Sequence, residues 1–286
     1  MKAQYENKVI SSLMLYIDHK LCMRGEAYTN YSSFFYEGSQ VYSNIFNYSA
    51  PFKQFVMDES IPNANVLSGV NVKSGQWHFL TPGTSGLHSI NHTQGATHFT
   101  THVTGQERIS GDYAVKDFNI YLTNLSEQEI LFETKFHTRP KVHEAVSGLA
   151  ADAETYPAIF VKSNGSKNEP FSFGGSDKTI IEARMIVLAD SAFLLDASCS
   201  ILRDCVKEIV PTISESLPFN ALGAYTGQAY NYTGIATGTG VFIDKAFVSK
   251  NVGGGYNNLN PDVHAAFVDF ELVETRKPRQ FTVGSQ

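Results

Sequence analysis

The stretch TIIEARMIVLADSAFLLDASCSILRDCVKEIVP, residues 179–211, joins two patterns that decide the fold. Residues 179–189 form a nearly continuous apolar run, which is typical of a strand covered on both faces. From Leu194 to Ile209 apolar side chains recur at helical spacing, with charged residues on the opposite side. The stretch therefore predicts a buried strand followed directly by an amphipathic helix that packs on the same sheet.

The ends of this helix also have recognisable signals. Asp190 or Ser191 can accept a hydrogen bond from a free backbone N–H at the beginning of the helix. Pro211 has no N–H with which to continue the helical ladder. The predicted helix therefore covers about 191–210.

Most of the remaining chain has the short, aromatic and alternating patterns of strands between turns. Strands are predicted within 51–60, 74–80, 112–123, 157–163 and 264–274, and in two extended arms around a Gly/Thr turn at 228–249. Residues 85–103 predict a hairpin in which Gly95 takes a positive φ. Ser126 and Glu129 have capping-box spacing, so 126–136 predicts at most a brief helical turn followed by a strand. Two polar stretches, 164–178 and 252–262, are interpreted as loops.

These patterns predict an α+β, β-rich fold: antiparallel sheets with one main amphipathic helix packed on a sheet. Charge, Pro, Gly and small residues gather at 137–157, which suggests a boundary there. We expect a β-rich domain at 1–137 and an α+β domain at 138–286. The second domain ends in an arm, 275–286, with too few apolar residues to fold alone.

Composition excludes several classes of protein. The chain has 286 residues, a net charge of −6 and no long block of Lys or Arg, which argues against a groove for sequence-specific nucleic acid. The apolar run Val9–Ile17 is too short for a membrane span and lacks a signal-peptide cleavage site, so no membrane partner is expected. Cys22, Cys199 and Cys205 are odd in number and widely spaced, which favours reduced thiols.

Five of the nine histidines lie within 25 residues, and they are the most unusual local feature of the chain. They are His78, His88, His92, His98 and His102. Three imidazoles across a hairpin could hold a metal ion. No Asp, Glu or Cys lies between 78 and 102, so we favour polar strand faces or a subunit contact and predict no metal site.

No nucleophile or cofactor motif stands out. Ser85 lies near His88 but lacks the Gly-X-Ser-X-Gly elbow, and GIATGTG at 234–240 lacks the lysine of a phosphate loop. We therefore predict no catalytic residue, no cofactor and no enzymatic activity. A hydrolase with scattered acidic residues remains an alternative, because spacing does not reveal such sites.

Several stretches resemble virion proteins of tailed bacteriophages. In the first half these are YIDHKLCMRGEAYTNYSSFFY (16–36), SAPFKQFVMDESIP (49–62), GLHSINHTQGATHF (86–99) and SGDYAVKDFNIYLT (110–123). In the second half, 156–164, 171–210 and 265–274 resemble the strand–strand–helix plan of tail-terminator and neck-completion proteins. The large first half departs from the compact terminators.

The resemblance implies a structural subunit of the virion, assembled in the host cytoplasm. It implies a homo-oligomeric ring, with sixfold symmetry favoured, at the junction of head and tail, in contact with other neck or tail proteins. Another virion station stays open, namely baseplate, decoration or receptor-binding protein, as does an enzyme that cleaves cell wall or capsule.

Overall fold

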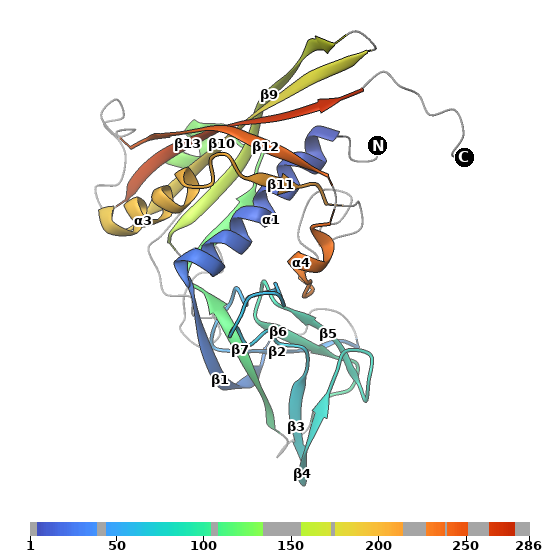
Figure 1. Ribbon diagram of the computed structural model, residues 1–286. Coiled ribbons are helices and arrows are strands. Elements are labelled where there is room, and N and C mark those ends of the chain that lie inside the picture. The colour runs from blue at the N-terminus through green and yellow to red at the C-terminus, as the bar shows by residue number, and fades with distance from the viewer. Residues whose placement is uncertain are drawn as a thin grey trace.

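Two β-sheets, one above the other in Figure 1, make up most of the molecule. The structure is a computed structural model that describes residues 5–38, 44–103, 108–133, 156–172, 175–213, 227–237, 239–250 and 263–277. Strands outnumber helices and nearly all of them pair antiparallel, so the predicted α+β, β-rich fold class is confirmed.

The upper sheet has six strands in the order β11-β12-β13-β10-β9-β8. They are β8 (Asn119–Leu122), β9 (Ala158–Ser172), β10 (Ser176–Ala189), β11 (Ile209–Pro211), β12 (Gly240–Ser249) and β13 (His264–Arg276). β8 and β9 run parallel and the other neighbours run antiparallel. β10 contains the predicted strand 179–189, and its alternate residues are buried in two apolar clusters, Met185 and Val187 in one and Ile186 and Leu188 in the other. Burial of both faces explains its almost unbroken apolar run.

Helix α3 (Ala192–Arg203) follows β10 directly, as predicted. Ser191 is its N-cap, because its side chain accepts a hydrogen bond from the backbone N–H of Leu194. The buried side of the helix, which includes Leu195, Cys199 and Leu202, packs against the upper sheet. The prediction that this helix lies on the sheet containing 179–189 is confirmed.

The predicted end of this helix at residue 210 is wrong. The helix ends at Arg203, and Lys207 then takes a φ of 67°. Lys207 N–H donates to the carbonyl of Ile243 over 2.8 Å, and β11 pairs with β12. Cross-strand hydrogen bonds replace the helical ones, so Pro211 ends a strand rather than a helix.

A second long helix, α1 (Tyr5–Gly25), has no counterpart among the predicted elements. It lies on the same face of the upper sheet as α3, between that sheet and the lower one (Figure 1). Its buried residues include Val9, Leu13, Leu15, Ile17 and Leu21, which point in several directions around the helix. A helix buried on several sides lacks a continuous polar stripe, so the amphipathic period that signals a surface helix is absent.

The lower sheet has seven antiparallel strands in the order β4-β3-β7-β1-β2-β6-β5. They are β1 (Tyr28–Glu37), β2 (Phe46–Ser49), β3 (Val70–Ser74), β4 (Gln76–Leu80), β5 (Leu87–Asn91), β6 (Ala96–Phe99) and β7 (Arg108–Lys116). One face encloses an aromatic core in which Phe55 stacks on Tyr113 at 4.1 Å between ring centroids. The predicted strand at 74–80 is confirmed as β4.

The hairpin predicted at 85–103 is confirmed as β5 and β6, with Gly95 at a φ of 62°. A Cβ atom at Gly95 would lie 2.0 Å from the carbonyl oxygen of Phe52. Glycine is therefore required at position 95 for two reasons: the turn needs a positive φ there, and the nearby 51–54 segment leaves no room for a Cβ atom.

Three strand predictions in the first half need correction. Residues 112–123 form two strands in different sheets, β7 and β8, because the chain breaks at Asp117 and Phe118 to pass from one sheet to the other. Residues 51–60 make isolated bridges instead of a strand, since they cross the end of the lower sheet. The capping box of Ser126 and Glu129 forms, but a π-helical turn, η1 (Glu129–Glu133), follows where a strand is predicted.

Two corrections concern the second half. Residues 164–172 and 176–178, predicted as a loop, continue β9 and β10 as a ribbon (Figure 1). Ser166 near its base donates a hydrogen bond to Glu6 of α1, and its tip extends beyond that helix. Because side chains on the β9 side of this ribbon are exposed, their composition is polar like that of a loop. In 228–249 a short helix, α4 (Tyr232–Ile235), precedes β12, so only one of the two predicted arms is a strand; 264–274 lies within β13, as predicted.

The domain boundary predicted at 137/138 and the loop predicted at 252–262 lie outside the described residues. Residues before 137 contribute to both sheets, since α1 packs on the upper sheet and β8 belongs to it. Of the arm 275–286, the first two residues belong to β13 and residues 278–286 lie outside the description. None of the described helices combines the length and apolar character needed to cross a bilayer.

Candidate functional site

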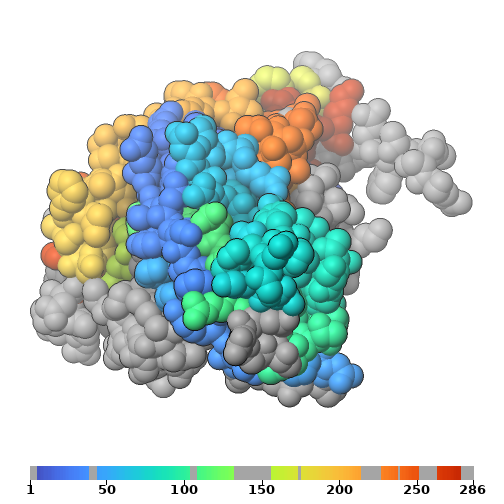
Figure 2. All heavy atoms as spheres, turned by 90° about the horizontal axis from the view of Figure 1, so that it is seen from below, coloured from blue at the N-terminus to red at the C-terminus, as the bar shows by residue number. Residues whose placement is uncertain are grey.

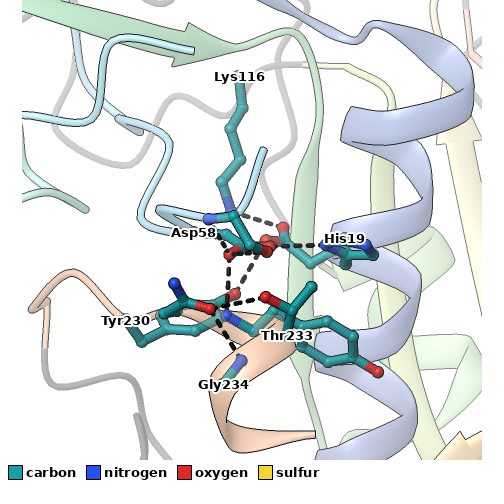
Figure 3. Close-up of polar contacts among 10 residues, drawn as sticks. His19, Asp58, Lys116, Tyr230, Thr233 and Gly234 are labelled. Carbon is teal, nitrogen blue, oxygen red and sulfur yellow. Dashed lines mark hydrogen bonds and ion pairs between the residues drawn. The ribbon is translucent and has the colours of Figure 1, made fainter. Parts of the chain in front are cut away.

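A cluster of buried polar side chains lies where the two sheets meet, and we call it the polar junction (Figure 3). Its members come from α1, the 55–60 segment, the last residue of β7 and the chain around α4. They are Asp18, His19, Asp58, Ser60, Lys116, Tyr230 and Tyr232. The junction thus links four segments that are distant in sequence.

Asp58 is the most highly coordinated member of the junction. Its Oδ2 lies 2.7 Å from His19 Nδ1, and its Oδ1 accepts hydrogen bonds from Ser60 Oγ, Ser60 N–H and Tyr232 N–H at 2.7–3.0 Å. Burial alone would raise the pKa of Asp58, but the hydrogen bonds from His19, Ser60 and Tyr232 outweigh it and hold this pKa below its usual value. Asp58 is therefore an ionised, fully bonded carboxylate that fixes the path of the chain.

Asp18 and Lys116 form a buried ion pair beside Asp58. The Lys116 Nζ to Asp18 Oδ1 distance is 2.5 Å, and the two side chains are 6% and 1% exposed. Tyr230 donates a hydrogen bond to the other oxygen of Asp18 at 3.3 Å. Removal of one partner would leave a buried charge uncompensated, which typically costs about 3–5 kcal/mol. This pair holds α1 against the end of β7.

His19 and Asp58 have the arrangement of a general base and its orienting carboxylate. Among the residues that the structure describes, no serine, threonine or cysteine side chain is hydrogen-bonded to His19. The imidazole instead stacks on the ring of Tyr232 with 4.5 Å between centroids. Burial also raises the pKa of the nearby Cys22 thiol, which opposes a reactive thiolate. The geometry therefore suits positioning of chain segments better than nucleophilic catalysis.

A second polar cluster fixes the turn after α3 against α1. Glu208 accepts hydrogen bonds from Tyr16 and Arg24, and Lys20 Nζ lies 2.6 Å from its Oε2. Burial raises the pKa of Glu208, but its bonds to Lys20 and Tyr16 outweigh this and lower the pKa overall. These contacts explain why the chain leaves the helical path after Arg203.

The five histidines of the sequence cluster lie in different surroundings. His92 is buried, with its ring nitrogens 2.8 and 2.9 Å from the carbonyls of Gly227 and Leu67, and burial lowers its pKa. His88 and His98 both contact Ser89 Oγ at 3.1 Å. His102 pairs with Glu37 at the surface, and His78 is exposed on β4.

These positions bear on the two interpretations of the histidines. Within the described residues, no group of three or more His, Cys, Asp or Glu side chains is arranged to hold a metal. His78 and His102 line a cleft of about 640 Å³ between β4 and the segment after β6, together with Ser85 and Thr101. Cys22, Cys199 and Cys205 are buried free thiols.

The surface also carries a group of exposed aromatic and basic residues that sequence patterns did not reveal. We call it the aromatic face. It lies on the side of β4, β3, β7 and β1 that points away from the aromatic core, and its main members are Phe34, Tyr36, Lys73, Trp77, Phe79 and Arg108. Alternation along each strand separates it from the core side chains.

Sequence reasoning also missed the polar junction. One signal was present: Asp18 directly follows the apolar run Val9–Ile17, and a carboxylate in a buried helix needs a partner. The partner could not be named, since Lys116 and Tyr230 are remote in sequence.

Comparison with known proteins adds no family assignment. No protein-family model matches the chain, and no curated protein is significantly similar to it. The functional interpretation therefore relies on the chain's own residues and geometry.

Proposed function

We propose that this chain is a non-enzymatic structural subunit of a tailed-bacteriophage particle. In this proposal it forms a homo-oligomeric ring, with sixfold symmetry favoured, at the head–tail junction as a tail-terminator or neck protein. The sequence resemblance supports this assignment. The upper sheet also supports this assignment. Its long β9–β10 hairpin is followed by a helix on one face of the sheet, and β13 pairs with β10.

The observation that carries the proposal is the projecting ribbon of β9 and β10. Residues 164–172 of β9 are exposed, and Phe171 near the tip is 63% exposed. On the side away from β10, the described residues give β9 a strand partner only at 158–161. A long ribbon with an open edge and an exposed aromatic tip has the features of an element that docks on another subunit.

The edge of β9 also has features that restrict random strand pairing. Pro170 offers no N–H, Lys167 places a charge on the edge, and the register with β10 shifts between Ser163 and Gly165. Natural proteins use such features against uncontrolled aggregation. We therefore expect the ribbon to contact its neighbour mainly through side chains such as Phe171, in a head-to-tail contact that can close into a ring.

Native mass spectrometry of the purified protein, alone and mixed with the other virion proteins, tests this proposal. We expect the native chain to give the mass of a closed ring. The Phe171→Ser variant should give less of this ring species or none. Trp77→Ser is the matched control. It also removes an exposed aromatic ring, but from the lower sheet and not from the ribbon, so it should leave the number of subunits in the ring unchanged. A chain that stays monomeric in every mixture would overturn the ring.

Antibody labelling of virions in negative stain tests the station. Label at the head–tail junction supports a terminator or neck role. Label at the baseplate or capsid surface, or no label, would contradict that role.

A further inference from the structure

The aromatic face is built in rows that cross four strands of the lower sheet. Phe79 pairs with Asn71, Asn71 with Ser110, and Ser110 with Phe34. The next row begins with Trp77, which pairs with Lys73, and Lys73 pairs with Arg108. Aromatic rings therefore lie on β4 and β1, and a polar strip on β3 and β7 separates them.

The rings of this face are uncovered although they are large and apolar. Trp77 is 47%, Phe79 58%, Phe34 39% and Tyr36 54% exposed. Figure 2 views the molecule from the end where the β3–β4 hairpin lies, and the teal spheres of that region form open surface. Trp77 and Phe79 are neighbours on one face of β4, as Phe34 and Tyr36 are on β1, and exposed aromatic side chains gathered in this way usually mark a site of interaction.

Gly69 contributes to the shape of this face. A Cβ atom there would lie 2.6 Å from the ring of Phe79 and 2.3 Å from the carbonyl oxygen of Leu80. The absence of a side chain lets the Phe79 ring lie close to the backbone beside β3. The ring is thus held at the surface by the backbone around it.

The face also carries two positive charges, those of Lys73 and Arg108. Lys73 and Arg108 are both exposed, and neither lies within ion-pair distance of a carboxylate among the described residues. Lys73 Nζ is 5.9 Å from the Trp77 ring centroid, and Arg108 Cζ is 5.7 Å from that of Phe34. In a chain of net charge −6, two adjacent unpaired cations favour an anionic ligand at this place.

The polar groups between the rings restrict the class of anion. Asn71, Ser110 and Ser32 offer amide and hydroxyl groups, and Asp112 is an exposed carboxylate on the same face. A carboxylate accepts hydrogen bonds from the hydroxyl groups that every ring of a polysaccharide carries, whereas the phosphates of a nucleic acid offer no donor to it.

We propose that the aromatic face binds an acidic polysaccharide. The rings of Trp77, Phe79 and Phe34 stack against the apolar C–H faces of sugar rings. Lys73 and Arg108 pair with sugar carboxylates, while Asn71 and Asp112 bond to hydroxyls. The binding site lies in the lower sheet and does not depend on ring formation. A test of saccharide binding is therefore independent of a test of the proposed assembly.

The dimensions of the face require a chain rather than a single sugar. β4 and β1 are separated by three strand spacings, which is about 14 Å. A monosaccharide cannot reach both groups of rings, whereas an oligosaccharide laid across the strands can. We therefore expect affinity to rise with the length of the saccharide.

Trp77 is the only tryptophan of the chain, so its fluorescence reports directly on this face. Titration with oligogalacturonate should change the emission in a saturable way, and added salt should weaken the binding. Arg108→Ser and Phe34→Ala retain Trp77, and each should lower the affinity by about tenfold or more. His78→Ala is the matched control, because it changes an exposed side chain on the other face of β4 and should bind like the native protein.

Two competitor ligands complete the test. Neutral dextran should bind much more weakly than oligogalacturonate, and oligothymidylate should not compete. The proposal is overturned if oligogalacturonate gives no saturable change, if Arg108→Ser and Phe34→Ala bind like the native protein, or if oligothymidylate is the tighter ligand.

Discussion

At the scale of single residues, the polar junction uses ionised groups to specify how the two sheets meet. Asp58 receives donors from α1, from its own segment and from the first residue of α4. Asp18 receives one from the end of β7 and one from Tyr230. Apolar side chains at these positions would pack but would not select one arrangement, because hydrogen bonds are directional and hydrophobic contacts are not.

The depressed pKa of Asp58 predicts how stability depends on pH. Because the native state binds this proton more weakly than the unfolded chain does, the carboxylate stabilises the fold above its unfolded-state pKa, near 3.8. That contribution disappears as the pH falls through the lower folded-state pKa. We expect the difference in free energy of unfolding between the native protein and Asp58→Asn to be large near neutrality and to shrink below about pH 4.

Urea unfolding between about pH 6 and about pH 2 measures this difference. Asp112→Asn is the control, because its exposed side chain makes no comparable set of bonds and the substitution should leave stability nearly unchanged. A difference for Asp58→Asn that stays constant down to the lowest pH would show that the carboxylate is not the source of the stabilisation.

At the scale of elements, the glycines of the β5–β6 and β3–β4 turns allow the cost of backbone strain to be separated from the cost of a steric clash. Gly95 has a φ of 62°, and a Cβ atom added to it would lie 2.0 Å from the carbonyl oxygen of Phe52. Gly75, in the β3–β4 turn, has a φ of 74° but no atom within 4 Å of a Cβ. Gly75→Ala should therefore cost about 1 kcal/mol of stability from backbone strain alone, and Gly95→Ala clearly more.

Thermal or urea unfolding of the two variants side by side checks this expectation. Equal losses would mean that the 51–54 segment moves away from an added methyl group without cost. In that case the close approach at Gly95 would be unimportant for the hairpin.

Elements whose surroundings match their local pattern could be predicted from the sequence. β10 is buried on both faces and has a continuous apolar run, and α3 is exposed on one side and has an amphipathic pattern. α1 is buried on several sides and has no such period, and the β9–β10 ribbon is so exposed that its strands look like a loop. The end of α3 depended on β12, a strand that follows much later in the chain.

The candidate sites were less predictable than the fold, for a related reason. The junction joins Asp18 to Lys116 and Asp58 to His19 across the two sheets, and spacing along the chain does not record such contacts. The aromatic face depends on strand register, which places Trp77 beside Lys73 and Arg108. The histidines, by contrast, were conspicuous in sequence but lie in different surroundings in the structure.

At the scale of the whole molecule, α1 is the element that the two sheets share. It packs on the upper sheet with α3, and its Asp18 and His19 contact residues that follow or border the lower sheet. The ribbon and the aromatic face lie toward opposite ends of the molecule (Figure 1). This arrangement allows one end to contact neighbouring subunits while the other contacts a different ligand.

Two truncations of the C-terminal arm have different expected results. Arg276 lies over the ring of Tyr5 at 3.8 Å and donates to Thr179 Oγ1 at 2.7 Å, so it ties the end of β13 to α1 and β10. Truncation after Glu274 removes these contacts and should lower the melting temperature. Truncation after Lys277 keeps them, so melting should stay unchanged. We propose that 278–286 docks on an adjacent copy in the ring, so this truncation should weaken ring assembly. Calorimetry and native mass spectrometry separate the two effects, and normal assembly after the second truncation would show that these residues are dispensable for the ring.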